Sequence, residues 1–195
     1  MDYKVLSVDD FNIGELEITN LAPTLISETV SYKTVAMSRG IHRLEVSGSI
    51  MLENQDQVRK WQAFILGVLG RAMPWKLDTG ADSSWHNPFY LPVRGVTLST
   101  SGGIGNTKLT VSQVNQMRLG ALVQFGDNLK IHVITDIQQQ NSQITIFPPL
   151  PYAMPQGTPL KFDVKPLLRF DEDNFKVIYG SRGNEVNFKA SEAIL

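Results

Sequence analysis

The stretch GIHRLEVSGSIML, residues 40–52, carries the clearest strand pattern in the chain. Its apolar residues share one parity: Leu44, Val46, Ile50 and Leu52. Its polar residues, Glu45, Ser47 and Ser49, share the other. This period of two predicts a half-buried β-strand, and Gly48 within it indicates a bulge or a close approach of another segment. The preceding LISETVSYKTVAM, residues 25–37, is predicted to be its partner strand, joined through a turn at residues 38–40.

The period changes directly after this strand. Apolar residues then recur every three or four positions: Val58, Trp61, Phe64, Ile65, Val68 and Leu69. Asn54 is a suitable N-cap, with Gln57 as its capping-box partner, and Gly70 suits the left-handed residue that ends a helix. The sequence therefore predicts one helix at residues 55–69. No second segment has comparable periodicity, so this helix should pack on a sheet.

Short strand candidates separated by turns fill the second half of the chain. They are VRGVTLS (93–99), TKLTVSQ (107–113), ALVQF (121–125), LKIHVITDI (129–137), QITIF (143–147) and PLKFDV (159–164). In the fourth, Leu129, Ile131, Val133, Thr135 and Ile137 are predicted to share a face, and ALVQF is its hairpin partner. Such closely spaced strands indicate a compact barrel or sandwich. Beyond them, LLRF, FKVIYG and VNFKA alternate again in the manner of the first half.

These patterns predict a mainly β protein in two units. A β-sandwich-like domain with one α-helix comprises residues 1–90 and 165–195, and a small β-barrel, residues 91–164, is inserted into it. Residues 165–195 are expected to return to the first unit, because that unit otherwise has too few strands to cover its helix and sheet.

The amino-acid composition argues against several classes of function. The chain has 195 residues, 42% of them hydrophobic, with 18 basic and 19 acidic side chains. A general polyanion binder is therefore not expected. The absence of cysteine excludes disulfides and thiolate chemistry. The amino terminus lacks the apolar run of a signal peptide, and AFILGVLG is too short to span a bilayer, so a soluble protein made in the cytoplasm is expected.

The sequence matches no catalytic or metal-binding motif well. In SGGIGNT, residues 101–107, the glycines precede a strand rather than the helix that a phosphate loop requires, which favours a hairpin loop. His42, His86 and His132 are not at ligand spacing, and the acidic clusters at residues 9–10 and 171–173 lack a calcium-loop pattern. No nucleophile elbow occurs. We therefore predict no catalytic residue, no cofactor and no metal.

For two features, local sequence alone allows two interpretations each. Trp75, Trp85, Phe89 and Tyr90 could form a stacking platform for sugars or bases, or could pack between the two units. PPLP, residues 148–151, could be a polyproline ligand, or could end a strand by removing a hydrogen-bond donor, which is the favoured interpretation.

The order of several motifs resembles distal tail proteins of siphophages. The motifs are IHRLEVSGSIML, the helix NQDQVRKWQAFILGVLG, WHNPFYLPVRG, LGALVQFGDNLKIHVITDI, ITIFPPLPYAMPQGTPLKF, LLRF and VNFKASEAIL. Together they cover most of the chain. The resemblance implies a ring-forming domain with an inserted barrel similar to an oligonucleotide/oligosaccharide-binding fold (OB-fold). It also implies that PPLP ends a barrel strand.

The resemblance further implies a structural virion protein rather than an enzyme. It would form a hexameric ring at the tail tip, assembled in the host cytoplasm, that joins the tail tube protein to the hub or baseplate and possibly to fibre proteins. Neither a specific nucleic acid nor a membrane is an implied partner. The alternative is a monomeric carbohydrate- or nucleic-acid-binding barrel that uses Trp85, Phe89 and Tyr90; a hydrolase is a more distant one.

Overall fold

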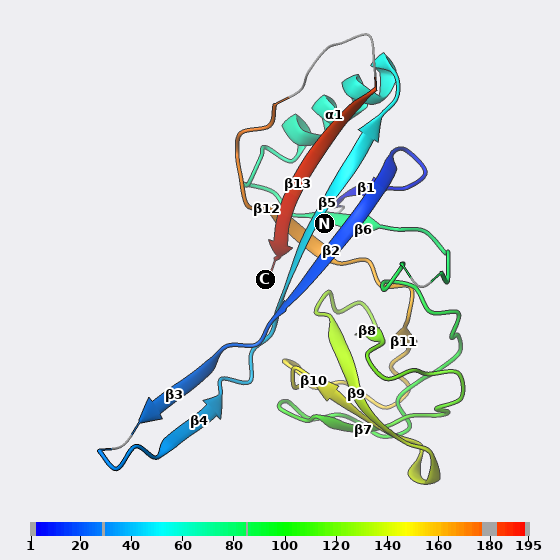
Figure 1. The fold of residues 1–195 in the computed structure, drawn as a ribbon. Helices are drawn as coiled ribbons and strands as arrows, with labels where there is room; N and C mark the ends of the chain where they lie inside the picture. The colour runs from blue at the N-terminus through cyan, green and yellow to red at the C-terminus, as the bar shows by residue number, and fades with distance from the viewer. Residues whose placement is uncertain (1–2, 29, 85, 177–182, 194–195) are drawn as a thin grey trace.

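The computed structural model describes residues 3–28, 30–84, 86–176 and 183–193. The protein is mainly β with one α-helix, as predicted. Figure 1 shows a helix-covered sheet, a smaller curled sheet beside it, and a hairpin that projects away from both.

The larger sheet has six strands, assembled from both ends of the chain. Their order is β1 (Lys4–Ser7), β6 (Trp75–Asp78), β12 (Leu167–Phe170), β13 (Asn184–Glu192), β5 (Arg43–Leu52) and β2 (Asn12–Leu21). Only β1 and β6 pair in parallel. The C-terminal strands therefore lie in the middle of the sheet that the N-terminal strands begin. The predicted domain boundaries themselves stay a prediction.

Strand β5 has the predicted pattern, because Leu44, Val46, Ile50 and Leu52 are all buried. Gly48 is a point of close approach, as expected. A Cβ atom there would lie 2.8 Å from Cδ2 of Leu16 and 3.1 Å from the ring of Phe188. The neighbouring strand β2 has an irregular register between Ile13 and Leu16, directly opposite. Gly48 thus lets side chains of both neighbouring strands pack over β5.

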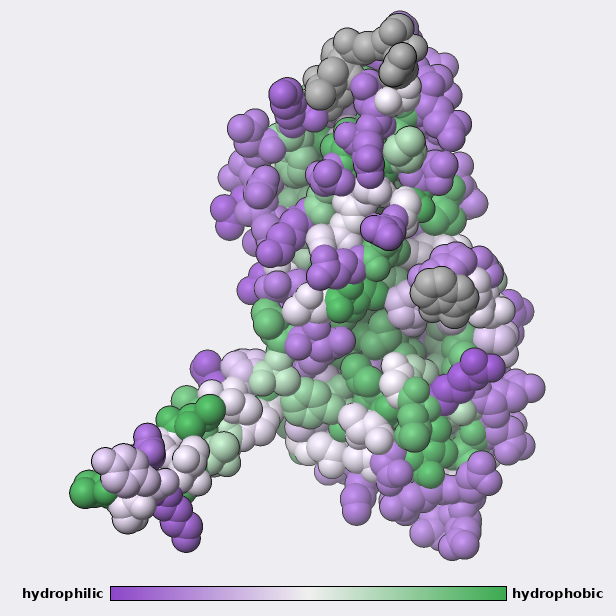
Figure 2. Space-filling view, viewed as in Figure 1, coloured by the Kyte–Doolittle hydropathy of each residue, from purple (hydrophilic) through white to green (hydrophobic). Residues whose placement is uncertain are grey.

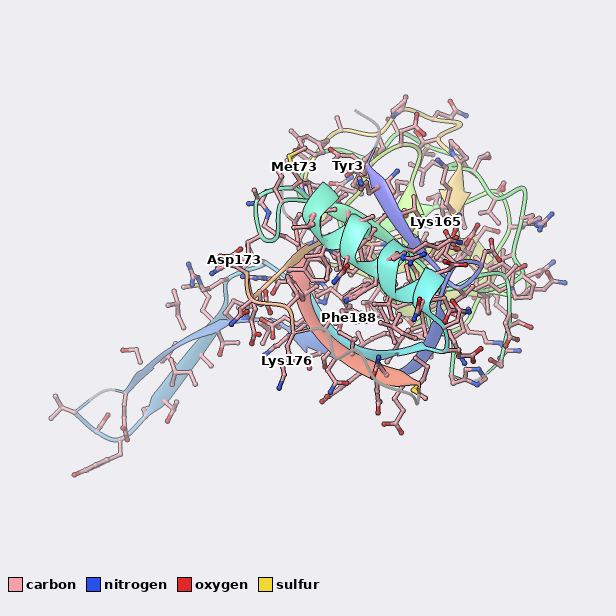
Figure 3. All side chains as sticks on the ribbon, turned by 90° about the horizontal axis from the view of Figure 1, so that it is seen from above. Tyr3, Met73, Lys165, Asp173, Lys176 and Phe188 are labelled. Carbon is pink, nitrogen blue, oxygen red and sulfur yellow. The ribbon has the colours of Figure 1, made fainter. Side chains whose placement is uncertain are left out.

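Helix α1 spans Gln55–Gly67 and is capped as predicted. The Oδ1 of Asn54 accepts a hydrogen bond from the Gln57 backbone N–H (2.9 Å), and the side chain of Gln57 reaches back to the N–H of Glu53 (2.7 Å). The helix ends before the predicted Leu69, because Leu69 and Gly70 both adopt left-handed backbone angles. Leu69 is consequently exposed rather than part of the buried face. Figure 3 shows the helix lying across the sheet.

The prediction that residues 25–37 form one partner strand of β5 is wrong. This segment folds back on itself as β3 (Thr24–Glu28) and β4 (Thr34–Ser38), which pair with each other in a separate two-stranded sheet. A turn at residues 30–32, with Tyr32 at a positive φ, reverses the chain. The neighbours of β5 are β2 and β13 instead.

The smaller sheet has five strands. Their order is β11 (Leu160–Lys161), β8 (Leu122–Phe125), β9 (His132–Gln138), β10 (Gln143–Phe147) and β7 (Lys108–Thr110), with a short 3-10 helix η1 (Gln139–Asn141) between β9 and β10. The predicted hairpin of β8 and β9 is present. Residues 93–99, predicted to be a strand, form only isolated bridges, through Thr97 and Leu98. These bridges help the sheet to curl.

The predicted face of β9 is wrong because this strand lies between two cores. Ile131 is buried in the core of the larger sheet and Val133 packs against that core, whereas Ile134 is buried in the barrel core and Ile137 packs there. Thr135 is exposed. The pairing with β10 skips Thr135, since Thr145 lies opposite Asp136 and Ile146 opposite Ile134, and this bulge moves Ile137 to the other side of the strand from Val133. The alternation rule assumes one buried face and therefore fails here.

Candidate assembly surfaces

Two of the four aromatic residues considered for stacking, Trp75 and Phe89, are buried. Trp75 lies in β6 with no exposed surface, and Phe89 is 1% exposed within the core of the larger sheet. Tyr90 is half-buried. Trp85 lies outside the described residues. Packing therefore explains Trp75 and Phe89, whose rings are inaccessible to a sugar or a base.

The acidic clusters are held by ordinary structural contacts. Asp10 pairs with Lys60 of the helix (2.9 Å). Asp171 accepts a hydrogen bond from the Ser191 hydroxyl (2.6 Å), and Asp173 accepts one from the Arg71 backbone N–H (3.0 Å). Within the described residues, no group of three His, Asp or Glu side chains could hold a metal ion.

The glycine segment at residues 101–107 is a loop on the barrel. Gly102 and Met154 exchange backbone hydrogen bonds of 2.8 Å, and Gly105 adopts a positive φ. Strand β7 follows, so no helix terminus points into the loop. A phosphate site of the helix-terminus type has no basis at this position.

Two of the three histidines are buried where the sheet meets the barrel. His132 donates from Nδ1 to the carbonyl oxygen of Pro148 (2.8 Å), while its Nε2 is buried without a hydrogen-bond partner. Burial lowers the pKa of His132 to about 4. His42 bonds to Oδ1 of Asn20 (2.8 Å), and its pKa is also lowered, first by burial and then by Lys130. Both rings are held in the neutral form at neutral pH.

A buried carboxylate connects the larger sheet to the barrel. Glu192, at the end of β13, accepts hydrogen bonds from the backbone N–H groups of Leu44 and Ile131 (3.2 Å each) and from Nζ of Lys130 (2.5 Å). Lys130 also donates to the carbonyl oxygen of His42 (2.8 Å). The side chain of Glu192 is 2% exposed. Sequence analysis missed this residue because its position in an alternating terminal strand resembles a surface glutamate.

A hollow of about 420 Å³ opens beside this carboxylate. Three segments line it: Asp127–Lys130 from the β8–β9 link, Pro151, Tyr152 and Met154 after β10, and Glu192 and Ala193 at the end of β13. We call it the junction hollow. The charged residues that line it already have partners, since Lys130 pairs with Glu192 and Asp127 with Lys161 (3.0 Å). The hollow still offers apolar surface and the side-chain N–H donor of Asn128, whose Nδ2 is buried without a hydrogen-bond partner.

The proline segment contributes one wall of the junction hollow. Its first part is built into the barrel: Leu150 is 1% exposed and exchanges backbone hydrogen bonds with Gly105 and Asn106. Pro151 and Tyr152 come next and are exposed, Tyr152 by 56%. The segment therefore ends a barrel strand, as favoured, and then presents an aromatic ring to solvent.

Strands β3 and β4 form a projecting hairpin, which we call the arm. Every described residue from Leu21 to Arg39 is exposed. Figures 1 and 3 show the arm extending away from both sheets, and Figure 2 shows hydrophobic residues on its surface. A two-stranded hairpin standing alone in water is marginally stable at best. The arm thus has the features of a segment that a partner covers.

The two faces of the arm differ in chemistry. Directly paired residues of antiparallel strands point to the same face. Leu25 pairs with Met37 and Ser27 with Val35, which gives a face with three large apolar side chains that are 54–63% exposed. The opposite face holds Thr24, Ile26, Glu28, Thr34, Ala36 and Ser38. It is mostly polar or small, with Ile26 as its one large apolar residue.

A comparison with protein-family models and with curated proteins found no match to this chain. Within the described residues, no helix combines the length and the apolar character that crossing a bilayer requires.

Proposed function

We propose that this protein is a structural component of a siphophage tail tip, where six copies form a ring that joins the tail tube to the hub or baseplate. The motif order supports this function, because it resembles that of distal tail proteins. The architecture agrees with that resemblance: one helix covers a sheet, and a barrel is connected to the sheet by chain segments on both sides.

The observation that carries the proposal is the arm. Exposed apolar surface on a projecting hairpin is a liability in a monomer, because unpaired strand edges and apolar patches promote association. The same surface is useful in an assembly, where a neighbouring copy can cover it. A ring protein acts through geometry, since unlike contacts repeated by rotation close into a ring with a lumen.

The arm also separates this proposal from a monomeric ligand-binding module. Such a module was predicted to use Phe89, which is buried in the core of the larger sheet. It would have no use for an apolar hairpin held away from the barrel. Ring formation gives the arm a role.

Electron microscopy of the purified protein tests the proposal. Negatively stained particles should show closed rings with a central opening. A version in which residues 24–38 are replaced by a short Gly-containing turn should remain folded by circular dichroism and should form no rings. Particles without any ring, from the complete chain at high concentration, would overturn the proposal.

A further inference from the structure

We propose that His42 and His132 form an acid-sensitive joint, which holds the base of the arm against the barrel at neutral pH and loosens in mild acid. The joint lies within a single chain. The inference therefore does not depend on ring formation, and its test applies to a monomer and to an assembly alike.

His42 connects the base of the arm to the barrel. It lies in the link between β4 and β5, and its Nε2 bonds to Oδ1 of Asn20 near the end of β2 (2.8 Å). These are the two segments from which the arm projects (Figure 1). On the barrel side, the ring of His42 packs edge-on against Phe147 (6.0 Å between centroids), and Lys130 donates to its carbonyl oxygen (2.8 Å). A change at His42 therefore acts on the arm and the barrel together.

His132, the first residue of β9, is the part of the joint that belongs to the barrel. Its Nδ1 donates to the carbonyl oxygen of Pro148, directly after β10 (2.8 Å), and its ring packs edge-on against Phe125 of β8 (5.3 Å between centroids). Burial is the main reason that the pKa of His132 is lowered, and the charges of Lys130 and His42 lower it further. The two histidines therefore oppose each other's protonation.

Protonation of either ring is unfavourable in its closed surroundings. The bond to Asn20 leaves Nδ1 of His42 as the nitrogen without a proton, and the bond to Pro148 leaves Nε2 of His132 in the same state. Both of these atoms are buried, and neither has a hydrogen-bond partner among the described residues. A proton would therefore create, in each ring, a buried N–H without an acceptor and a buried positive charge.

The charges around the two rings are balanced only while both rings are neutral. Within the described part of the chain, the ammonium of Lys130 acts on both rings and the carboxylate of Glu192 acts on His42. Lys130 and Glu192 already neutralise each other as an ion pair. Two imidazolium ions would thus leave three cations with one carboxylate, and opening the joint to water relieves this repulsion.

Acid should therefore shift the equilibrium from a closed joint to an open one. Opening exposes the ring of His132 to water, where its pKa returns to 6.5 from about 4 in the closed joint. The open joint consequently binds more protons between these values. Lowering the pH from 7 to 5 should favour opening by about twentyfold through His132 alone, and His42 should add to this effect.

Hydrogen–deuterium exchange followed by mass spectrometry tests the joint in the complete chain. Protection factors at pH 7 and pH 5, corrected for the intrinsic pH dependence of amide exchange, are compared for residues 40–46 and 129–135 and for helix α1. The two joint segments should lose protection by at least about tenfold at pH 5. They should also be less protected than helix α1 at that pH, because local opening requires less free energy than global unfolding.

The three histidines of the chain supply matched variants. His42→Gln with His132→Gln keeps amide donors for Asn20 and Pro148 but cannot titrate, so protection of the joint segments should change by less than about twofold between pH 7 and pH 5. His86→Gln is the control, since this side chain is 64% exposed, and it should retain the full response. Each single variant, His42→Gln or His132→Gln, should lose its own share of the response, which gives a test that does not require the double variant to fold.

Three results would overturn the inference. The first is unchanged protection of the joint segments of the natural chain between pH 7 and pH 5. The second is exchange of these segments no faster than that of helix α1 at pH 5, which would mean that acid acts only through global unfolding. The third is a full response in the variants that lack His42 or His132. Faster exchange in the joint than in the helix, dependent on these two histidines and not on His86, supports the inference whether or not rings form.

Discussion

At the scale of single residues, Trp61 is the centre of the helix–sheet contact. It has no exposed surface. Its ring packs against four other aromatic rings at centroid distances of 6.0–6.4 Å, those of Phe11, Phe64, Phe170 and Phe175. Trp61→Ala should lower the free energy of unfolding by about 3–5 kcal/mol, measured by denaturant titration. Leu66→Ala on the same helix, where the side chain is 73% exposed, is the control and should cost less than about 0.5 kcal/mol. Equal losses would contradict this account.

The lowered pKa of His132 predicts that the free energy of unfolding depends on pH. Its pKa is 6.5 when unperturbed and about 4 in the folded chain, so the unfolded state binds more protons between these values. The free energy of unfolding should therefore fall as the pH falls from 6.5 to 4, by about 3 kcal/mol in total from this group. Protonation would also place a buried N–H at Nε2, which has no acceptor.

The test is denaturant titration across this pH range. His132→Gln keeps an amide donor near Pro148 but cannot titrate. The free energy of unfolding of this variant should therefore fall less steeply as the pH is lowered, and His42 should account for the remaining fall. An unchanged slope in this variant would show that His132 is not responsible.

The ion pair of Lys130 and Glu192 gives a further prediction. Lys130→Met leaves a carboxylate that is 2% exposed without its cation and should cost about 3–5 kcal/mol. Adding Glu192→Gln removes the charge but retains only one carbonyl oxygen, whereas the N–H groups of Leu44 and Ile131 bind different oxygens of Glu192, so it should recover only part of the loss. A double-mutant cycle by thermal or chemical unfolding measures this coupling. Additive losses would contradict it.

At the scale of elements, predictability followed the strength of the local pattern. Helix α1 and strand β5 were predicted from sequence because each has a full period and, for the helix, matching caps. The arm was misread as one strand because its two short strands have weak alternation and no Gly-Pro or Asn-Gly signal between them. Strand β9 was assigned the wrong face because its two sides face two different cores.

The candidate surfaces were harder to predict than the elements. The junction hollow combines residues from three segments that are separated in sequence, and no local pattern in these segments indicates that they meet. The role of Glu192 depends on donors from two other strands or links. Nothing in a local pattern indicates that an apolar face, such as that of Leu25 and Met37, is left uncovered by its own chain.

The two central C-terminal strands predict how the chain responds to truncation. Strands β12 and β13 lie between β6 and β5, and Phe170 and Phe188 from them are in the main core. Ending the chain after Lys165 should therefore unfold the helix-bearing sheet, because each lost apolar side chain contributes roughly 1.5–3 kcal/mol against a total of about 5–15 kcal/mol. Circular dichroism and amide-proton dispersion would report the loss. A well-folded truncated chain would show that these strands are dispensable.

At the scale of the whole molecule, the larger sheet and the barrel form one continuous body, from which the arm projects. The barrel shares side chains with the core of the larger sheet, including Leu122, Ile131 and Val164, and the Glu192 carboxylate adds polar contacts between them. None of the arm's described residues, in contrast, belongs to either core. A body with one projecting apolar hairpin is suited to an assembly in which another molecule covers the hairpin.

The mass of the natural assembly tests the central claim, ring formation, most directly. Native mass spectrometry over a rising concentration series should show a dominant species at six times the chain mass of 21.7 kDa, with few intermediates of two to five chains at the highest concentrations. Loss of that species on removal of the arm would attribute it to the hairpin. A chain that remains at 21.7 kDa throughout the series would contradict the claim.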